Sequence, residues 1–174
     1  MQVQQSFSEY YGTVESNNTS ENETISGNGN YYIHDAIFSF HYQKTAIHLN
    51  SSSKVLLETC TFYNNSSTTS GGSFYIKDSD CVLVHICIFL SSTTSSGCGY
   101  YIQSAQNSYN KSYAFESSVS QCSGTFYSFY HWHGDIKVNN MNTSYHEITK
   151  YAGYSIQNPS GTGIIKAPVP PSQF

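Results

Sequence analysis

Residues 71–89 read GGSFYIKDSDCVLVHICIF, and three short apolar patterns within this stretch recur along the chain in the same order. The first is an alternating strand, whose copies begin 26 or 27 residues apart at Ile47, Phe74, Tyr100, Tyr127 and Tyr154. The second follows at 55–57, 82–84, 113–115 and 136–138, with an earlier copy at 31–33. The third is an apolar pair after a bend, at 36/38, 60/62 and 87/89.

This repeat predicts an all-β chain folded as a right-handed parallel β-helix. We expect a solenoid of about five coils of roughly 27 residues, with three short strands per coil. A β-sandwich or barrel would also contain many short strands, but neither requires a fixed period with strand types in constant order. Segments 64–72 and 91–99, rich in Ser, Thr and Gly, should form matching loops on one side.

Every second residue of a strand should face the interior and stack on its equivalent in the next coil. We expect two core ladders, formed by Ile47, Phe74, Tyr100, Tyr127 and Tyr154 and by Leu57, Val84, Phe115 and Val138. Cys60 and Cys87 should stack as buried thiols, which pack as small hydrophobes. On the outer side of the first strand, a candidate binding face should be formed by His48, Tyr75 and Tyr101.

The chain length fits one domain with three segments. A polar N-terminal segment, 1–29, is expected to cap the first coil, and 30–166 to form the β-helix. Residues 164–166 should start a last strand, before the Pro-rich tail at 167–174 forbids further ladder pairing. Imperfectly capped coil ends could pair with another copy, end to end or laterally, and build filaments.

The composition excludes several partners. The net charge of −4 supplies no basic field for nucleic acid. There is no run of about 18 apolar residues, so no membrane span is expected. Residues 1–7 have neither the basic nor the apolar region of a signal peptide. The chain is therefore either cytoplasmic, or a trimmed or mature fragment of a surface or extracellular protein.

Eight Asn-x-Ser/Thr sequons are candidate N-glycosylation sites. They are Asn17, Asn18, Asn22, Asn50, Asn64, Asn65, Asn110 and Asn142. Glycan acceptors in secreted proteins lie in surface loops, where these sequons are expected. A chain this rich in Asn, Ser and Thr also makes sequons by chance, so both interpretations stay open.

No catalytic or metal constellation stands out, and neither enzymatic activity nor a cofactor is expected. Glycoside hydrolysis needs two carboxylates flanking the scissile bond, but the chain has four aspartates, of which Asp78 and Asp80 read as turn residues. His131 and His133, with Asp135 nearby, could share a metal, although an aromatic-rich corner is the favoured interpretation. The five cysteines contain no Cys-x-x-Cys spacing.

Coil alignment also places residues after the second strand in one outward ladder. Its members are His34, Glu58, His85, Glu116 and Asn139. Alternation of His and Glu would relieve the repulsion between like charges stacked about 5 Å apart. A pH-responsive stripe is the functional alternative to this structural interpretation.

The stretch 71–89, together with 30–38 (NYYIHDAIF), resembles the pectin-lyase-like β-helix repeats of large protozoan surface proteins, particularly those of trichomonads. The resemblance covers roughly 30–165, and its degenerate motifs report the fold more than the function. It implies a surface protein, usually longer and carrying a signal peptide and anchor. Pectate lyases of this fold use arginine and a calcium-binding carboxylate cluster, and this chain has no arginine.

The leading hypothesis is a non-catalytic structural or adhesive module of a cell-surface or extracellular assembly. Its partners would be itself, other structural proteins or glycans. One alternative is an intracellular structural protein that decorates a larger assembly. The other is a carbohydrate-binding or carbohydrate-cleaving protein that uses the tyrosine face.

Overall fold

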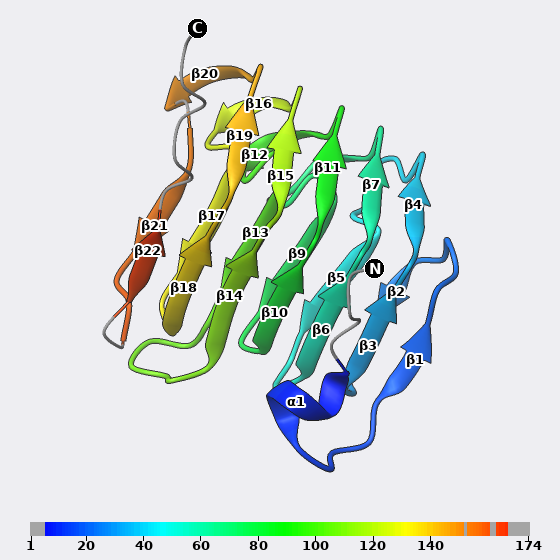
Figure 1. The fold of residues 1–174 in the computed structure, drawn as a ribbon. Helices are drawn as coiled ribbons and strands as arrows, with labels where there is room; N and C mark the ends of the chain where they lie inside the picture. The colour runs from blue at the N-terminus through cyan, green and yellow to red at the C-terminus, as the bar shows by residue number, and fades with distance from the viewer. Residues whose placement is uncertain (1–5, 152, 161–162, 167–174) are drawn as a thin grey trace, which may run out of the picture.

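The computed structural model describes residues 6–151, 153–160 and 163–166. The chain winds into a β-solenoid of about five turns with roughly 26-residue spacing, as the repeat predicts (Figure 1). The strand pairs of the described residues are all parallel and form four sheets, here named A to D. Sheets A and B begin in the first coil, sheet C begins at residue 37 and sheet D begins at residue 66. This architecture is compatible with a pectin-lyase-like β-helix.

Sheets A and B carry most of the apolar interior. Sheet A contains β1 (Asn17–Thr19), β3 (Tyr31–His34), β6 (Lys54–Glu58), β10 (Asp80–Val84), β14 (Lys111–Phe115), β18 (Asp135–Asn139) and β22 (Ile164–Lys166). Sheet B contains β2 (Ile25–Ser26), β5 (Ile47–Asn50), β9 (Phe74–Lys77), β13 (Tyr100–Gln103), β17 (Phe129–Trp132) and β21 (Ser155–Gln157).

The remaining two sheets close each coil. Sheet C contains β4 (Ile37–Ser39), β7 (Thr61–Tyr63), β11 (Cys87–Phe89), β15 (Ser118–Ser120) and β19 (Asn142–Ser144). Sheet D contains β8 (Ser66–Ser67), β12 (Ser92–Ser96), β16 (Ser123–Phe126) and β20 (Glu147–Tyr151).

From the third coil onward, sheet D supplies a fourth strand in each coil. Its strands β8 and β12 lie within segments 64–72 and 91–99, which were predicted to be loops. Its paired inward positions are Ser67, Thr93 and Gly124, followed by Ile148 in the last coil. Because hydroxyl groups and a glycine fill the first three positions, the segment shows no apolar alternation. Three strands per coil was therefore an undercount.

The corner between sheets A and C is formed by residues with positive φ. It is turned by Asp35, Thr59, His85, Glu116 and Asn140, whose φ angles lie between 47° and 54°. The strand positions opposite Glu58 are consequently Val84 and then Phe115. The predicted ladder that aligned Glu58 with His85 and Glu116 is wrong by one residue, although His34 does pair with Glu58.

The inward ladder of sheet A runs through Leu57, Leu83, Ala114 and Val138. Leu57 and Val138 were therefore predicted correctly, whereas Val84 and Phe115 belong to the outer face. A slip of one residue exchanges the two faces of a strand. The error arose because 55–57 and 82–84 are apolar at each position, so alternation could not fix the register.

The aromatic ladder of sheet B follows the prediction until the fourth coil. The rings of Phe74, Tyr100, Phe129 and Tyr154 stack at successive centroid distances of 4.9, 5.3 and 5.1 Å, and Ile47 pairs with Phe74. Tyr127 is not a member.

Tyr127 instead turns the corner from sheet D to sheet B, with a φ of 51°. The previous two coils use Gly71 and Gly97 at this corner, both with positive φ. Because Tyr127 occupies a corner position that the previous coils fill with glycine, it was mistaken for the first residue of a strand. The residue that stacks on Tyr100 is Phe129, two positions later.

The predicted stack of Cys60 on Cys87 is also wrong. Cys60 is buried in the core, but Cys87 pairs with Thr61 and lies on the outer, half-buried side of sheet C. Ile86 and Ile88 take the buried positions beside it. Since 86–89 is apolar throughout, either alternation would have fitted the sequence.

The N-terminal segment does more than cap one end. Helix α1 (Phe7–Tyr11) lies against the outer face of sheet A, where Phe7 and Tyr11 pack with Leu56 and Val82. β1 and β2 extend sheets A and B, so the solenoid begins before residue 30.

Asn22 covers the exposed edge of β4. Its Oδ1 accepts a hydrogen bond from the Ser39 amide at 3.1 Å, and its Nδ2 donates to the Ser39 carbonyl at 3.4 Å. At the other end, β22 pairs with β18 as predicted for the last strand. The proline-rich tail lies outside the described residues.

In the described part of the chain, no helix has the length and apolar character needed to cross a membrane.

Candidate functional site

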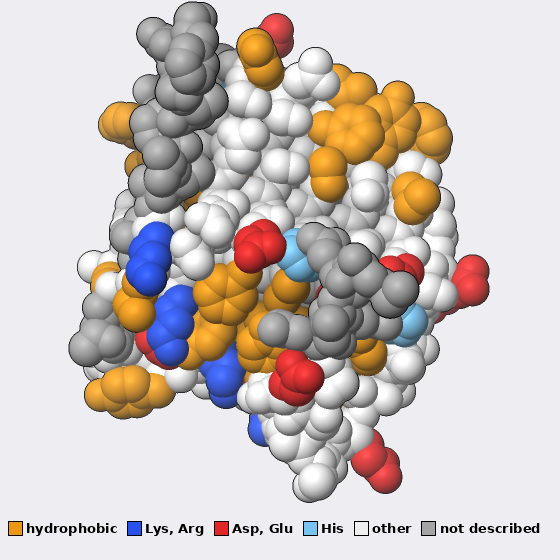
Figure 2. Space-filling view, viewed as in Figure 1, with side chains coloured by type: hydrophobic (Ala, Val, Ile, Leu, Met, Phe, Trp, Pro, Cys, Tyr) orange, Lys and Arg blue, Asp and Glu red, His pale blue; other side chains and the backbone are white. Residues whose placement is uncertain are grey.

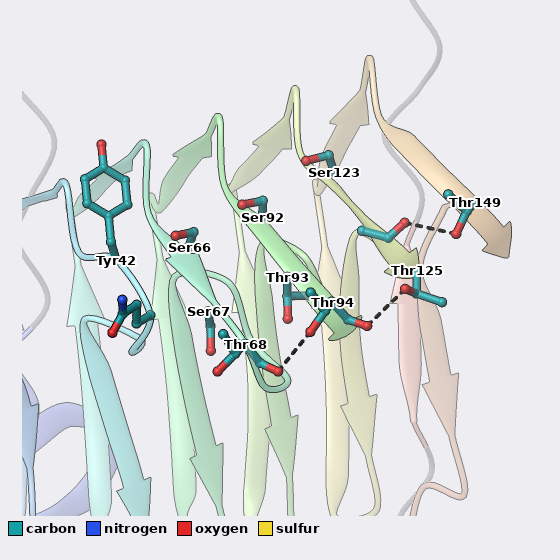
Figure 3. A pocket seen from close by; sticks show the side chains of 12 residues that line it. Tyr42, Ser66, Ser67, Thr68, Ser92, Thr93, Thr94, Ser123, Thr125 and Thr149 are labelled. Carbon is teal, nitrogen blue, oxygen red and sulfur yellow. Dashed lines mark hydrogen bonds between the residues drawn. The ribbon is translucent and has the colours of Figure 1, made fainter.

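A groove runs over sheet D along the axis of the solenoid (Figure 3). Its volume is about 520 Å³. We define this D-sheet groove by its lining residues, which are Tyr42, Gln43, Ser66, Ser67, Thr68, Ser92, Thr93, Thr94, Ser123, Gly124, Thr125 and Thr149. Its lining residues come from five successive coils, and four of these coils contribute a strand of sheet D, so similar groups recur along the length of the groove.

A row of threonines forms the centre of the groove. The Thr94 hydroxyl donates to the Thr68 carbonyl at 2.9 Å, and the Thr125 hydroxyl to the Thr94 carbonyl at 3.0 Å (Figure 3). Thr149 repeats the arrangement toward Gly124 at 3.5 Å. Each hydroxyl proton is thus directed to the backbone of the preceding coil, which holds the row in one spacing.

One end of the groove carries an aromatic ring and continues into a second hollow. Tyr42 is 55% exposed and stands at this end in Figure 3. The adjoining hollow, about 500 Å³, shares Gln43 and Thr68 with the groove and also contains Lys44 and His48. The groove over sheet D and this hollow therefore adjoin at the corner that leads to sheet B.

The predicted tyrosine face exists and extends by one residue, Tyr130. Centroids are 5.0 Å apart for His48 and Tyr75, 5.3 Å for Tyr75 and Tyr101, and 4.8 Å for Tyr101 and Tyr130. Neighbouring rings cover one another's faces, and Tyr101 and Tyr130 are buried. Because a sugar stacks on a free ring face, this geometry favours a stabilising ladder, with His48 at its exposed end.

The two histidines of the 131–135 stretch do not share a site. His131 points inward, where its Nε2 lies 2.9 Å from the Tyr100 hydroxyl and its Nδ1 lies 2.8 Å from the Ser112 hydroxyl. Burial lowers the pKa of His131 to about 3. His133 lies at a corner with positive φ and stacks on Trp132. The corner interpretation was therefore the better one.

A cluster formed by Cys98, Cys122 and His146 was not predicted from the sequence. One potential ligand atom from each residue lies within 4.8 Å of the others. Both thiols are buried and His146 is half-buried. Cys122 and His146 lie at the equivalent corner between sheets C and D in successive coils, whereas Cys98 lies at the corner between sheets D and B one coil earlier. No spacing within one coil could therefore have indicated the cluster.

A third hollow reaches this cluster from outside. Its volume is about 550 Å³, and Cys122 contributes to its lining beside Gln121, Tyr145 and Glu147. We name it the Cys122 hollow. It adjoins the D-sheet groove through Ser92 and Ser123, which line both.

The eight sequon asparagines differ in accessibility. The exposed ones are Asn17, Asn18, Asn22, Asn50 and Asn142, and the half-buried ones are Asn64 and Asn110. Asn65 is 1% exposed. Its Nδ2 donates to the Phe38 carbonyl and its Oδ1 accepts from the His41 amide, both at 3.0 Å. Glycan attachment at Asn65 is not favoured by this geometry, and use of the others remains a prediction.

Two further surfaces stand out in Figure 2. Lysines lie among hydrophobic side chains over sheet A, where Lys54 and Lys111 approach the Tyr11 ring. A second hydrophobic patch lies over β4 and β7, where Ile37 and Phe40 are 62% and 56% exposed. Phe40 contacts Tyr63 with a ring distance of 5.5 Å.

Comparison with family models, curated proteins and solved structures gave no match.

The D-sheet groove was missed because 64–72 and 91–99 were interpreted as loops. A signal was present in the run Ser-Ser-Thr-Thr, which occurs at 66–69 and again at 91–94. Hydroxyl residues that recur at the coil spacing indicate a polar ladder, just as recurring apolar residues indicate a core ladder.

Proposed function

We propose that this chain is a non-catalytic adhesive module that binds an extended, hydroxyl-rich polymer along the D-sheet groove. A polysaccharide chain is the polymer that fits this chemistry. A surface or extracellular setting, as in the trichomonad-type β-helix repeats that the sequence resembles, is part of the same proposal.

The observation that carries the proposal is the row of threonines at Thr68, Thr94, Thr125 and Thr149. A solenoid repeats the same groups at every coil, so a polymer of repeating units can make equivalent contacts along the groove. Threonine offers oxygen acceptors and methyl groups, which suit the hydroxyl and C–H surfaces of sugars. The exposed ring of Tyr42 adds an amphipathic aromatic surface at one end.

The chemistry of the lining residues favours binding over cleavage. Glycoside hydrolysis requires two carboxyl groups, about 5–9.5 Å apart, on either side of the bond. Among the described residues that line the D-sheet groove and the two adjoining hollows, Glu147 is the one carboxylate. A single carboxylate cannot supply both the acid and the base.

The test is binding of the purified chain to a panel of insoluble polysaccharides and to an oligosaccharide array. Thr94→Glu places a charge in the middle of the groove, and Tyr42→Ala removes its aromatic end; each should weaken binding at least about tenfold. Matched controls are Thr61→Glu, on the outer side of sheet C, and Tyr109→Ala, an exposed tyrosine outside the groove. Absence of binding, or equal loss in the controls, would refute the proposal.

The hydrophobic patch supports a second candidate, a structural protein within a larger protein assembly. Exposed apolar patches on soluble proteins commonly mark contact sites, and Ile37 and Phe40 lie together with Tyr63 at one end of sheet C. Sedimentation of wild type and of Ile37→Asp over a concentration series tests self-association. A wild-type monomer at all concentrations would remove the self-associating version of this candidate.

A further inference from the structure

We infer that Cys98, Cys122 and His146 form a binding site for a thiophilic metal cation, with Zn²⁺ as the reference ion. This site is separate from the D-sheet groove and does not depend on the proposed function. Two thiolates and an imidazole are ligands that Zn²⁺ takes in proteins, and soft sulfur ligands select Zn²⁺ and Cu⁺ over Mg²⁺ and Ca²⁺.

The geometry already brings the ligand atoms close to the required separation. One atom from each residue lies within 4.8 Å of the other two. With Zn–S near 2.3 Å and Zn–N near 2.1 Å, tetrahedral ligand atoms lie roughly 3.5–3.8 Å apart. A small inward movement of the side chains therefore suffices to hold the ion.

The sequence leaves room for this cluster at Gly124, an inward position of sheet D. A Cβ there would lie 3.1 Å from the Cβ of Cys98 and 2.9 Å from the Thr93 carbonyl oxygen. The following coil has Ile148 at the equivalent position. Absence of a side chain at Gly124 therefore allows Cys98 to pack close to the backbone of β16.

His146 is oriented as a metal-binding histidine usually is. Its Nδ1 accepts a hydrogen bond from the Cys122 amide at 3.2 Å, so the ring proton lies on Nε2. Nε2 is 2.6 Å from the Thr143 hydroxyl. A hydrogen bond from the second ring nitrogen fixes the tautomer and ring plane of histidine ligands. The Nδ1 lone pair faces Cys122 and accepts the amide hydrogen bond of that residue, so the imidazole exchanges this bond for the metal when the ion binds.

The hydrogen bonds that hold His146 continue from Thr143 to Ser128 and on to the backbone of Gly153. Thr143 Oγ1 lies 3.0 Å from Ser128 Oγ, which donates to the Gly153 carbonyl at 2.7 Å. The chain His146–Thr143–Ser128 is therefore anchored on the backbone of the last coil. Hydrogen bonds of this kind hold a metal-binding imidazole in one orientation.

Both thiols of the cluster donate to backbone carbonyls. Sγ of Cys122 donates to the Ser120 carbonyl at 3.2 Å, and Sγ of Cys98 donates to the Ser128 carbonyl at 3.9 Å. Metal binding to the pair would release one proton from each thiol that is protonated beforehand. The fourth ligand would be a water molecule that enters through the Cys122 hollow, whose wall includes Glu147.

The other thiols supply internal controls. Burial raises the pKa of Cys60 to about 11 and also raises that of Cys81. Among the described residues, Cys98, Cys122 and His146 are the one group of three His, Cys, Asp or Glu side chains whose potential ligand atoms lie this close together. Cys87 lies half-buried on the outside of sheet C and makes the best matched control.

The experiment is calorimetric titration of the fully reduced chain with Zn²⁺, repeated with Co²⁺ to observe thiolate-to-metal absorption. Wild type should bind one equivalent and show that absorption. Cys122→Ser and His146→Gln should each weaken Zn²⁺ binding at least about a hundredfold, and Cys87→Ser should leave it unchanged. Thr143→Val should weaken Zn²⁺ binding about 10–100-fold, because this substitution removes only the hydroxyl that bonds Nε2 of His146.

Circular dichroism and thermal unfolding test whether each variant is folded. Because His146 is half-buried, His146→Gln is the substitution least expected to disturb the core. Failure of the folded wild type to bind Zn²⁺ would overturn the inference. So would equal affinity in wild type and His146→Gln. An intact mass lower by two hydrogens, lost on mutation of Cys98 or Cys122, would assign a disulfide to the pair and exclude the metal site.

Discussion

The Tyr100 hydroxyl lies 2.9 Å from Nε2 of His131 in the interior of the solenoid. The Ser112 hydroxyl bonds the other ring nitrogen at 2.8 Å, so both nitrogens are satisfied in the neutral ring. Burial also raises the pKa of the Tyr100 phenol well above its usual value. This polar triad takes the place of aliphatic side chains between Ile102 and Ile156, the neighbours of His131 in the ladder.

The first prediction is acid-sensitive stability that depends on His131. Its pKa is about 3 in the folded state and near 6.5 in the unfolded state, because burial disfavours the charged ring. The unfolded chain therefore binds the proton first. The contribution of the neutral His131 ring to the free energy of unfolding is fully present above about pH 6.5. As the pH falls from 6.5 toward 3, this contribution decreases by up to about 1.4 kcal/mol per pH unit.

Urea unfolding at a series of pH values, for wild type and His131→Leu, isolates this effect. At neutral pH the variant should be less stable by about 1–3 kcal/mol, because it leaves the Tyr100 hydroxyl buried without its partner. The difference should shrink as the pH falls below 6.5. A constant difference between pH 7 and pH 4 would contradict the assignment.

The second prediction compares two glycines with nearly equal φ angles, Gly12 at 69° and Gly97 at 68°. Nothing lies within 4 Å of a Cβ added at Gly12, so Gly12→Ala should cost only the strain of its backbone conformation (φ 69°, ψ −148°), about 1–3 kcal/mol. A Cβ at Gly97 would lie 2.2 Å from the Tyr100 carbonyl oxygen.

Gly97→Ala should therefore destabilise by at least about 3 kcal/mol, since strain from the clash adds to the backbone term. Chemical denaturation of the two variants measures the difference directly. If both alanines cost the same, the close packing of this corner against β13 would be incorrect.

The period of the solenoid was predictable because apolar residues recur in sheets A and B at the coil spacing. The register failed where that signal lost its alternation. At Val84 both faces of the strand are buried, the outer one by α1, so apolar residues occupy every position. At Tyr127 an aromatic residue takes a backbone conformation that the neighbouring coils give to glycine.

The candidate sites were less predictable than the fold. Outer stacking of His48 on Tyr75 follows from strand alternation and coil spacing, and both could be read from the sequence. To predict the cluster of Cys98, Cys122 and His146, one must know how closely the corner that holds Cys122 and His146 approaches the corner that holds Cys98, on the other side of sheet D. That distance depends on the width of sheet D, a sheet whose strands left no hydrophobic signal.

The third prediction concerns the contact of α1 with sheet A. The Tyr11 hydroxyl donates to the Val55 carbonyl at 2.9 Å, and Phe7 packs on the same apolar surface. Phe7→Ala should destabilise by about 3 kcal/mol and increase the binding of a hydrophobic dye, because Leu56 and Val82 lose cover. Tyr11→Phe should cost about 1 kcal/mol.

Thermal and urea unfolding measure these changes, with Tyr109→Phe as the control for Tyr11→Phe because Tyr109 is exposed. An unchanged stability and dye response in Phe7→Ala would mean that α1 does not cover sheet A in solution.

The fourth prediction separates Asn18 from Asn65, two asparagines in sequons of the same type. Asn18 is exposed on β1, whereas the Asn65 amide is buried and satisfies two backbone groups of the preceding coil, the Phe38 carbonyl and the His41 amide. Asn65→Ala should destabilise by about 2–4 kcal/mol, since it leaves both partners without their bonds. Asn18→Ala should change stability by less than about 0.5 kcal/mol.

Expression in a host that attaches N-glycans, followed by peptide mass spectrometry, tests the same contrast. If the chain is secreted, Asn18 should carry a glycan and Asn65 should not, because a folded Asn65 amide is inaccessible to the transferase. Modification of Asn65 in folded protein, or equal stability of the two alanine variants, would show that the Asn65 side chain does not bond the Phe38 carbonyl and the His41 amide of the preceding coil.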